Sequence, residues 1–374
     1  MRLTLVIFSL SPGGAERVMS IMANYWVVKG WNITLLTFDD GNKPPFYELD
    51  SRVHHIPLRI AADSSNLLLG FWNNLRRVQI LQSAIAQSKP DAVISFMEQV
   101  NMLTLLATRS LNLPTVVSER IDPTLYSVGR VWEKLRQWTY PLADQIVVQT
   151  KGAQTYFSPK LQSHTCIIPN QVLLPTREKT TSDKHLARRS IIAVGRLTQQ
   201  KGFDLLLQAF ASLTEFHSTW TLTIFGEGEL RRELESLRDS LALSGLVHFP
   251  GVVKNLDKVL RQADIFVLSS RFEGFPNVLC EAMASGLPVI STDCPSGPRE
   301  IIQDGVDGIL VPNQDAKALA LAMHRLMSDE AERKRLSACA TDVVERFSLE
   351  KVMAMWEKLL AQVVEERLGY DEHI

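Results

Sequence analysis

One stretch of the chain, residues 263–290 (ADIFVLSSRFEGFPNVLCEAMASGLPVI), limits the possible fold more than any other. Residues 264–268 form a short apolar run that is typical of a buried parallel strand. Pro276 is expected at the first position of a helix and Gly286 at its end, and residues 287–290 start a second strand. This order brings a helix N-terminus to the carboxyl edge of a parallel sheet. Because the first N–H groups of a helix are unpaired and partly positive, such an edge binds anions, phosphate above all.

Two carboxylates border this expected anion site, Glu273 in the loop and Glu281 in the helix. Glu281 comes one helical turn after Asn277, so the two side chains share a face of the helix. A carboxylate accepts two hydrogen bonds from a diol, which suits a nucleotide that carries hydroxyl groups. A capping loop followed by an ordinary surface glutamate explains the E-x7-E spacing equally well.

A second glycine loop, VGRLTQQKG at residues 194–202, directly follows the apolar run 190–194. Arg196 and Lys201 therefore lie beside the same sheet edge. A nucleotide diphosphate gains negative charge as its bond to a sugar breaks, and fixed cations stabilise that charge. Two solvated basic residues are the alternative, but the helix dipole disfavours cations at a helix start. The pattern favours a diphosphate site.

Apolar runs and helical patterns alternate along the chain, which predicts doubly wound α/β domains. A chain of 374 residues fits two domains of ordinary size, and the polar residues 174–189 are expected to link them. Strands are expected at 3–8, 33–38, 91–96, 114–118 and 145–149, then at 190–194, 222–226, 247–249 and 265–268. Helices are expected at 18–28, 316–327, 331–344 and 349–368.

The composition excludes several classes of protein. A net charge of −1 gives no support for nucleic-acid binding. The four cysteines have no CxxC spacing, so we expect reduced, buried thiols in a cytoplasmic protein. No run approaches the roughly 20 apolar residues of a membrane-spanning helix. We expect no signal peptide at the N-terminus, and a soluble or peripheral protein.

The string EGFPNVLCEAMASGLPVI resembles the donor-site motif of retaining GT-B glycosyltransferases of family 4, the group 1 transferases, and GRLTQQKG is similar to their diphosphate motif. The resemblance implies an α/β GT-B fold, in which two Rossmann-like doubly wound domains face each other across a cleft. Residues 1–172, joined by the C-terminal helix 349–374, would form the acceptor domain, and residues 173–348 the donor domain. The implied reaction moves a hexose or N-acetylhexosamine, with retention, from a nucleotide diphosphate sugar, here expected to be a UDP-sugar. The implied acceptor is a glycan or lipid-linked saccharide of surface polysaccharide or oligosaccharide biosynthesis.

The resemblance also implies the roles of individual residues. Arg196 and Lys201 would neutralise the diphosphate, helped by the helix that starts at Asn277. Glu281 would hold the ribose hydroxyls and Glu273 the donor sugar. The other expected donor-site positions are Gly13, Gly14, Gly251, Val252, Gly274, Phe275, Pro276 and Val278. Since no carboxylate is clearly placed as a covalent nucleophile, front-face displacement is favoured over double displacement.

The segment SERIDP (118–123) is expected on the acceptor side. Many members of the family have a histidine where this chain has Arg120, and that histidine contacts the transferred sugar. Arg120 is the fourth expected catalytic residue, with Glu273, Arg196 and Lys201. It is expected to donate hydrogen bonds in place of the histidine or to bind an acceptor phosphate, but it cannot act as a base. Glu98 is expected either to face the cleft or to form an ion pair with a neighbouring arginine.

Residues 126–142 form a basic amphipathic segment with two tryptophans. Such segments can lie on anionic membranes, which would make the protein peripheral on the inner face of the cell membrane. A helix packed on its own domain is the slightly favoured alternative. The expected apolar stripe contains Val128, Trp132, Leu135 and Trp138, beside the basic residues Arg130, Lys134 and Arg136.

No D-x-D triplet occurs, and no histidine has the spacing of a metal ligand, so we expect neither a metal nor a cofactor. Two other functions stay open. One is a GT-B sugar-nucleotide epimerase or hydrolase, which would act without an acceptor. The other is a catalytically silent scaffold that binds a nucleotide sugar without turnover, although the intact residues Arg196, Lys201, Glu273 and Glu281 argue against it.

Overall fold

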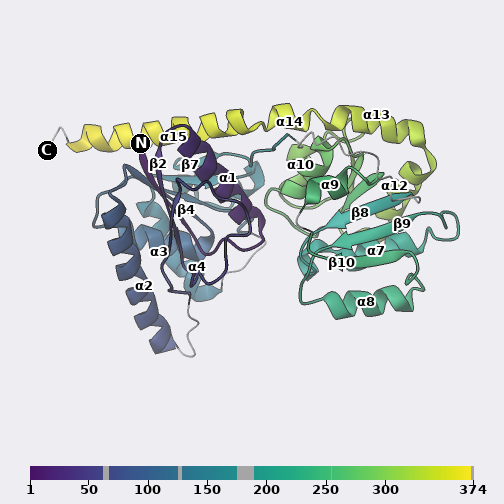
Figure 1. Cartoon of the computed structure of the whole chain (residues 1–374), viewed down its shortest axis with the longest axis horizontal. Coiled ribbons are helices and arrows are strands. Elements are labelled where there is room, and N and C mark those ends of the chain that lie inside the picture. Colours follow the sequence, from purple (N-terminus) through teal and green to yellow (C-terminus); the bar gives the residue numbers. More distant parts are fainter. Residues whose placement is uncertain (62–66, 125–128, 175–188, 254, 372–374) are drawn as a thin grey trace. The chain divides into compact units, whose positions relative to one another are not determined.

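The computed structural model describes residues 1–61, 67–124, 129–174, 189–253 and 255–371, in two compact units (Figure 1). The first unit contains Met1–Asn170 and Val352–Ile374, and the second contains Gln171–Lys351. The expected limits at 172 and 349 differ from these by two and three residues. Val172 belongs to the second unit because its N–H donates to the Phe347 carbonyl at 2.8 Å. The predicted linker 174–189 lies almost entirely outside the described residues.

The first unit is built on a seven-stranded parallel sheet with the order β3-β2-β1-β4-β5-β6-β7. Its strands are β1 (Arg2–Ile7), β2 (Asn32–Thr37), β3 (His54–Pro57), β4 (Ala92–Phe96), β5 (Thr115–Ser118), β6 (Gln145–Val148) and β7 (Thr165–Ile167). Its helices are α1 (Gly14–Val28), α2 (Leu67–Ser88), α3 (Glu98–Thr108), α4 (Arg130–Thr139), the 3-10 turn η1 (Tyr140–Leu142), α5 (Lys151–Thr155), α6 (Pro159–Gln162) and α15 (Leu349–Asp371). Every residue of the central strand β4 is buried, as expected for a parallel strand covered on both faces.

The second unit is built on a six-stranded parallel sheet with the order β10-β9-β8-β11-β12-β13. Its strands are β8 (Ser190–Val194), β9 (Thr221–Phe225), β10 (Val247–Gly251), β11 (Ile265–Leu268), β12 (Val289–Asp293) and β13 (Ile309–Pro312). Its helical segments are η2 (Gln199–Lys201), α7 (Phe203–Ala211), α8 (Arg231–Ser240), α9 (Leu256–Leu260), α10 (Asn277–Ala284), α11 (Pro298–Ile301), α12 (Ala316–Ser328), α13 (Glu330–Ala340) and α14 (Val343–Arg346). The predicted doubly wound α/β organisation is therefore confirmed in both units.

The last helix, α15, returns the chain to the first unit. Trp356 is buried, with its ring centroid 6.2 Å from that of Phe96 at the end of β4. Along the same helix, Glu357 pairs with Lys29 at 2.8 Å and Arg367 pairs with Asp144 at 3.2 Å. The first unit thus takes its core from both ends of the sequence.

Several elements differ from the sequence predictions. Helix α1 begins at Gly14, four residues before the predicted start at 18, because the polar first turn still has helical backbone and Glu16 there suits the helix dipole. The predicted helix 331–344 divides into α13 and α14, a break that lets both Ala340 and Val343 enter the core around α10. Pro276 precedes the first helical residue of α10 instead of occupying it.

The strands β3, β7 and β13 were not predicted. Strand β3 (HHIP) has no apolar run, and β13 (ILVP) ends in a proline. Both lie at sheet edges, where a short or proline-containing strand is tolerated. The prediction of four buried thiols is wrong for Cys166 and Cys339, which are only half-buried, whereas Cys280 and Cys294 are buried.

Candidate active site

In each sheet, the strand order reverses beside the first strand of the unit. The chain runs from β8 outward through β9 and β10 and then returns to β11 on the other side of β8. The first sheet does the same with β1 and β4. Loops after such neighbouring strands diverge at the carboxyl edge, which is where open α/β sheets bind ligands. In the second unit these loops are residues 195–202 and 269–276, the two motifs that the sequence singled out.

Hydrogen bonds join these two loops directly. The Ser269 hydroxyl donates to the Lys201 carbonyl at 2.9 Å, and the Gln200 amide group donates to the Phe272 carbonyl at 3.0 Å. A Cβ atom on Gly202 would lie 2.2 Å from the Ser269 carbonyl oxygen, and Gly202 has a φ of +61°. Only glycine permits this approach. The glycine of the GRLTQQKG motif therefore holds the two loops together.

An ion pair lies where the two loops meet. The Lys201 ammonium is 2.6 Å from Glu273 Oε1, and the Ser270 hydroxyl donates to the same oxygen at 2.5 Å. Glu273 is only 5% exposed. A buried carboxylate needs such partners, because its desolvation is costly. The ammonium has further N–H groups for an anion, and the carboxylate has further lone pairs for a hydroxyl.

The other expected donor residues surround this pair on different elements. Arg196 is exposed on the loop after β8, and within the described residues its guanidinium has no hydrogen-bond partner. Asn277 begins α10, Glu281 follows one turn later, and both are half-buried. The structure thus brings Lys201 and Glu273 into contact, and it places Arg196 on the first of the two loops and Asn277 directly after the second.

Among the remaining predicted donor positions, some can offer only backbone groups to a ligand, and others are buried in the core. Gly251 ends β10 with a φ of +89°, and Val252 beside it is exposed. The Phe275 side chain is buried against Phe347, with ring centroids 5.3 Å apart, so only its backbone is available to a ligand. Gly274 and Pro276 are buried in the same loop, and Val278 packs against the core.

Two supporting residues escaped the sequence analysis. Ser270 holds Glu273, but a lone serine after a strand carries no distinctive signal. Gly297, with a φ of +93°, follows β12, and a Cβ atom there would lie 2.6 Å from both the Gly274 carbonyl oxygen and Pro276 Cδ. The S-G-P sequence at 296–298 was the available signal of a tight turn.

In the first unit, the predicted residues lie around the reversal between β1 and β4. Gly13 has extended backbone before α1, and Gly14 is its first residue. Glu98 is the first residue of α3 and is buried, which raises its pKa. Within the described part of the chain it forms no ion pair, and the charge of Arg136 lowers its pKa against the larger effect of burial. The preceding Met97 has a φ of +80°, a sparsely populated conformation for a residue other than glycine.

Arg120 lies two residues after β5, and only 8% of it is exposed. Its guanidinium carbon is 4.1 Å from the centroid of the Phe96 ring. Nη1 donates to the Ser118 hydroxyl at 3.3 Å, and Nη2 donates to Asn170 Oδ1. Burial lowers the pKa of the Arg120 guanidinium to about 9, which still leaves it charged at neutral pH. Asn170 gave no signal in the sequence.

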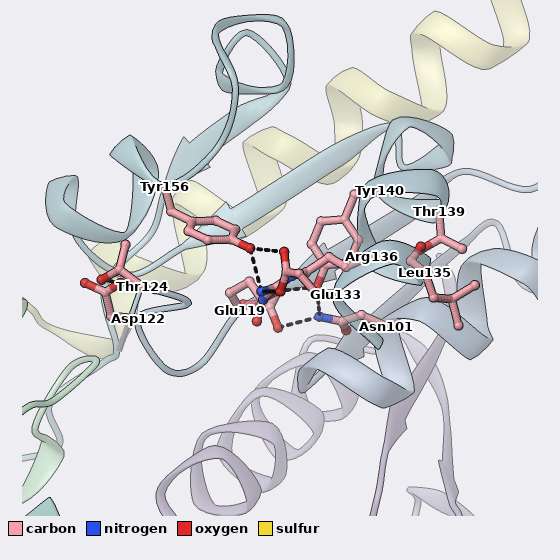
Figure 2. A network of polar contacts seen from close by, with 11 residues as sticks. Asn101, Glu119, Asp122, Thr124, Glu133, Leu135, Arg136, Thr139, Tyr140 and Tyr156 are labelled. Carbon is pink, nitrogen blue, oxygen red and sulfur yellow. Dashed lines mark hydrogen bonds and ion pairs between the residues drawn. The ribbon is translucent and has the colours of Figure 1, made fainter. Parts of the chain in front are cut away.

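The neighbouring residue, Glu119, points into a buried polar network (Figure 2). Arg136 donates to Glu119 Oε1 at 3.3 Å, and the Tyr140 hydroxyl donates to the same oxygen. Figure 2 shows Tyr140 and Tyr156 on two sides of this pair, and Arg136 donates to the Tyr156 hydroxyl at 2.6 Å. Burial and the like charge of Glu98 raise the pKa of Glu119 to about 7, against the opposing effects of Arg136 and Tyr140.

The network corrects the prediction for residues 126–142, of which 126–128, including Val128, lie outside the described residues. Arg136 is buried in the network instead of facing solvent with Arg130 and Lys134. The predicted stripe also divides, because Trp132 and Leu135 pack on the core of the unit whereas Trp138 is 80% exposed. Val131, 71% exposed, lies two turns before Trp138 on the same outer face.

Neither a metal-ion site nor a membrane-spanning helix is found among the residues that the structure describes. In that part of the chain, no three His, Cys, Asp or Glu side chains are grouped to hold a metal ion. No helix there has the length and hydropathy needed to cross a membrane.

Known structures share this fold across nearly the whole chain. Sucrose-phosphate synthase from Thermosynechococcus elongatus gives a TM-score of 0.81 at 21% identity, covering 98% of this chain and 100% of that one. HepE of Anabaena gives a TM-score of 0.78 at 18% identity, covering 97% and 100%. These similarities place the two units in the GT-B class of α/β folds.

Sequence comparison is more specific. Residues 13–171 match the "Glycosyl transferase 4-like domain", and residues 176–343 match "Glycosyl transferases group 1". The chain is 28% identical over 370 residues to an alpha-1,4-N-acetyl-D-galactosaminyltransferase of Campylobacter jejuni, covering 97% of this chain and 99% of that protein. It is 30% identical over 349 residues to an uncharacterized glycosyltransferase of Methanocaldococcus jannaschii, covering 79% and 86%. The chain belongs to the group 1 glycosyltransferases, which confirms the resemblance seen in the sequence.

Proposed function

We propose that this protein transfers a hexose or N-acetylhexosamine, with retention and without a metal ion, from a UDP-sugar to a lipid-linked saccharide or glycan acceptor. The observation that carries the proposal is the Lys201–Glu273 pair at the strand reversal of the second unit, 2.6 Å apart and held by Ser270. The pair offers one positive and one negative group side by side. A diphosphate joined to a sugar presents the complementary pair of groups, an anion and a set of hydroxyls.

In this proposal, Lys201 and Arg196 bind the diphosphate together with the first amides of α10. Glu273 accepts hydrogen bonds from the donor sugar, and Glu281 accepts them from the ribose. The bond between the anomeric carbon and the diphosphate oxygen breaks, and an acceptor hydroxyl attacks the same face of the sugar. The proton of that hydroxyl passes to the departing diphosphate. Cations fixed beside the leaving group stabilise its charge most when the bond is breaking.

The names of the relatives support the choice of acceptor. The two Campylobacter jejuni transferases are named for acceptors that carry a diphosphate and undecaprenol, and a relative from Erwinia amylovora is named for amylovoran biosynthesis. HepE, which shares the fold, is solved with UDP and with UDP-glucose. We therefore place the protein in surface polysaccharide or lipid-linked oligosaccharide biosynthesis.

A panel of UDP-, GDP- and ADP-sugars, added without divalent metal, tests the donor by thermal denaturation. We expect one UDP-sugar to stabilise the protein, since a ligand at about 100 times its Kd raises the free energy of unfolding by about 2.7 kcal/mol. If no UDP-, GDP- or ADP-sugar stabilised the protein, the result would contradict the proposal.

The stabilising donor is then incubated with and without a lipid-linked saccharide. Transfer that requires the acceptor supports the proposal. Acceptor-independent hydrolysis or epimerisation would identify the protein as a sugar-nucleotide epimerase or hydrolase, and binding without turnover would identify it as a silent scaffold.

We also propose that the outer face of α4, formed by Arg130, Val131, Lys134 and Trp138, contacts the anionic inner face of the cell membrane. Each basic residue near such a surface contributes about 1 kcal/mol. Replacing Arg130 and Lys134 with glutamine is expected to weaken binding to phosphatidylglycerol vesicles by about 30-fold in a flotation assay.

Phe216→Ala is the control for this experiment, because Phe216 of the second unit is an aromatic residue whose exposure is comparable to that of Trp138. It is expected to leave vesicle binding unchanged. Equal binding of the wild-type protein to phosphatidylcholine and phosphatidylglycerol would contradict the membrane contact.

A further inference from the structure

Arg120 is a buried cation that has no counter-ion among the residues that the structure describes. It forms no ion pair with any residue that the structure describes, although its side chain is more than nine-tenths buried. Burial lowers the pKa of the guanidinium, and the negative charge of Glu16 has a smaller, opposing effect that raises it. A buried, hydrogen-bonded charge normally has an opposite charge beside it, because removing a cation from water is costly. A buried cation without an opposite charge beside it is therefore suited to bind an anion.

The hydrogen bonds of Arg120 leave part of its donor capacity unused. A guanidinium has five N–H donors, and the structure shows two bonds, to Ser118 and Asn170. Nε is buried and has no partner. Both acceptors are neutral oxygens, so they orient the guanidinium without cancelling its charge.

The position of Arg120 is also rigid. It stacks on Phe96, the last residue of β4, and Phe96 in turn packs against Trp356 of α15. β4 is the neighbour of β1, so the cation lies at the strand reversal of the first sheet, where the loop with Gly13 and Gly14 also begins. Ligands of doubly wound sheets bind at such reversals.

We propose that Arg120 binds a phosphate oxygen of a diphosphate ester, as an anion site of the first unit. A guanidinium suits a phosphate because its planar N–H groups can make two parallel bonds to phosphate oxygens. The diphosphate belongs either to the sugar donor or to a lipid-linked acceptor. This inference rests on the proposed function for its choice of ligand, but binding alone tests it.

Asn170 provides a test that separates an anion site from a structural hydrogen bond. Asn170→Asp keeps the shape of the side chain and places a carboxylate against the guanidinium, whereas Asn170→Ala removes the bond without adding charge. We expect Asn170→Asp to raise the melting temperature of the ligand-free protein and to weaken diphosphate binding at least tenfold. Asn170→Ala is expected to lower the melting temperature and to leave binding within about threefold of wild type.

Calorimetric titration with two probes identifies the source of the diphosphate. UDP represents the donor, and farnesyl diphosphate represents a polyprenyl diphosphate acceptor. Weaker binding of UDP by Asn170→Asp and Arg120→Gln assigns the site to the donor, and weaker binding of farnesyl diphosphate assigns it to the acceptor. Either result supports the anion site. Unchanged binding of both probes in these variants overturns it, as does a fall in the melting temperature of Asn170→Asp equal to that of Asn170→Ala.

The two Asn170 variants keep the test decisive even if Arg120→Gln does not fold. The failure of this inference is distinguishable from the failure of the proposed function. If the wild-type protein binds diphosphates through Arg120 but transfers no sugar, only the proposed function is contradicted. If the protein transfers sugar but binds both probes independently of Arg120, only the inference is contradicted.

Discussion

Replacing Lys201 with alanine is expected to lower kcat for sugar transfer by about 100- to 1,000-fold, the usual effect of removing one preorganised charge-stabilising donor. The reason is the fixed position of the Lys201 ammonium. It lies 2.6 Å from Glu273 Oε1, and the Lys201 carbonyl accepts a hydrogen bond from Ser269 in the loop after β11. Because the charge on a leaving diphosphate grows during bond breaking, kcat should fall more than KM for the donor rises. Steady-state kinetics at saturating acceptor measure both.

Two controls separate chemistry from folding in this experiment. Lys334→Ala removes a lysine of the same unit whose side chain is 76% exposed, and it is expected to change nothing. Glu273→Gln removes the negative charge but still offers Lys201 a hydrogen-bond partner. If the ion pair is only structural, Lys201→Ala and Glu273→Gln should lower the free energy of unfolding equally. Retention of wild-type kcat by a folded Lys201→Ala protein would remove the basis of the proposed function.

The second large effect is a pH dependence of stability that comes from Glu119. The pKa of its carboxyl group is raised from 4.5 to about 7 in the folded protein, so the folded state prefers the protonated form. Its contribution to the free energy of unfolding is therefore fully present below pH 4.5 and is lost as the pH rises through 7. A shift of this size corresponds to about 3 kcal/mol, since each pKa unit is worth about 1.4 kcal/mol. Chemical denaturation between pH 5 and pH 8 measures the loss.

Glu119→Gln isolates this term, because glutamine mimics the neutral carboxyl group at every pH. The variant should match the wild type below pH 4.5 and exceed its free energy of unfolding by about 3 kcal/mol near pH 8. Charged and titratable groups face Glu119 from α3 (Glu98), α4 (Glu133 and Arg136), η1 (Tyr140) and the residue after α5 (Tyr156). Glu98→Gln should move the transition to lower pH, because the like charge of Glu98 raises the pKa of Glu119. Parallel wild-type and Glu119→Gln curves would show that the carboxyl group is ionised throughout.

The predictable part of this protein is the part that its local sequence determines. Apolar runs located β1, β8 and β11, since a strand covered on both faces must be apolar along its length. Glycine loops after β8 and β11 located the Lys201–Glu273 site, because the carboxyl ends of neighbouring parallel strands meet at one edge. Edge strands such as β3 obey no such rule, and they were missed.

The first unit shows what sequence reasoning could not reach. Arg136 looked like part of a basic surface, because its helix neighbours Arg130 and Lys134 are basic and exposed. Its burial depends on Glu119, seventeen positions away in the chain, and on Tyr156, twenty positions away. The link between Arg120 and Asn170 spans fifty positions. Contacts of this kind depend on the fold as a whole, and no periodicity announces them.

The return of α15 to the first unit has a consequence for how the protein is made. During synthesis the first 170 residues leave the ribosome long before Trp356, which must fill the space beside Phe96. The second unit, continuous in sequence, can fold as it emerges, whereas the N-terminal part of the nascent chain must wait with an open apolar groove. Completion of the first unit therefore has to follow the synthesis of the segment from Val352 onward, and a chain released before residue 352 would leave that groove open.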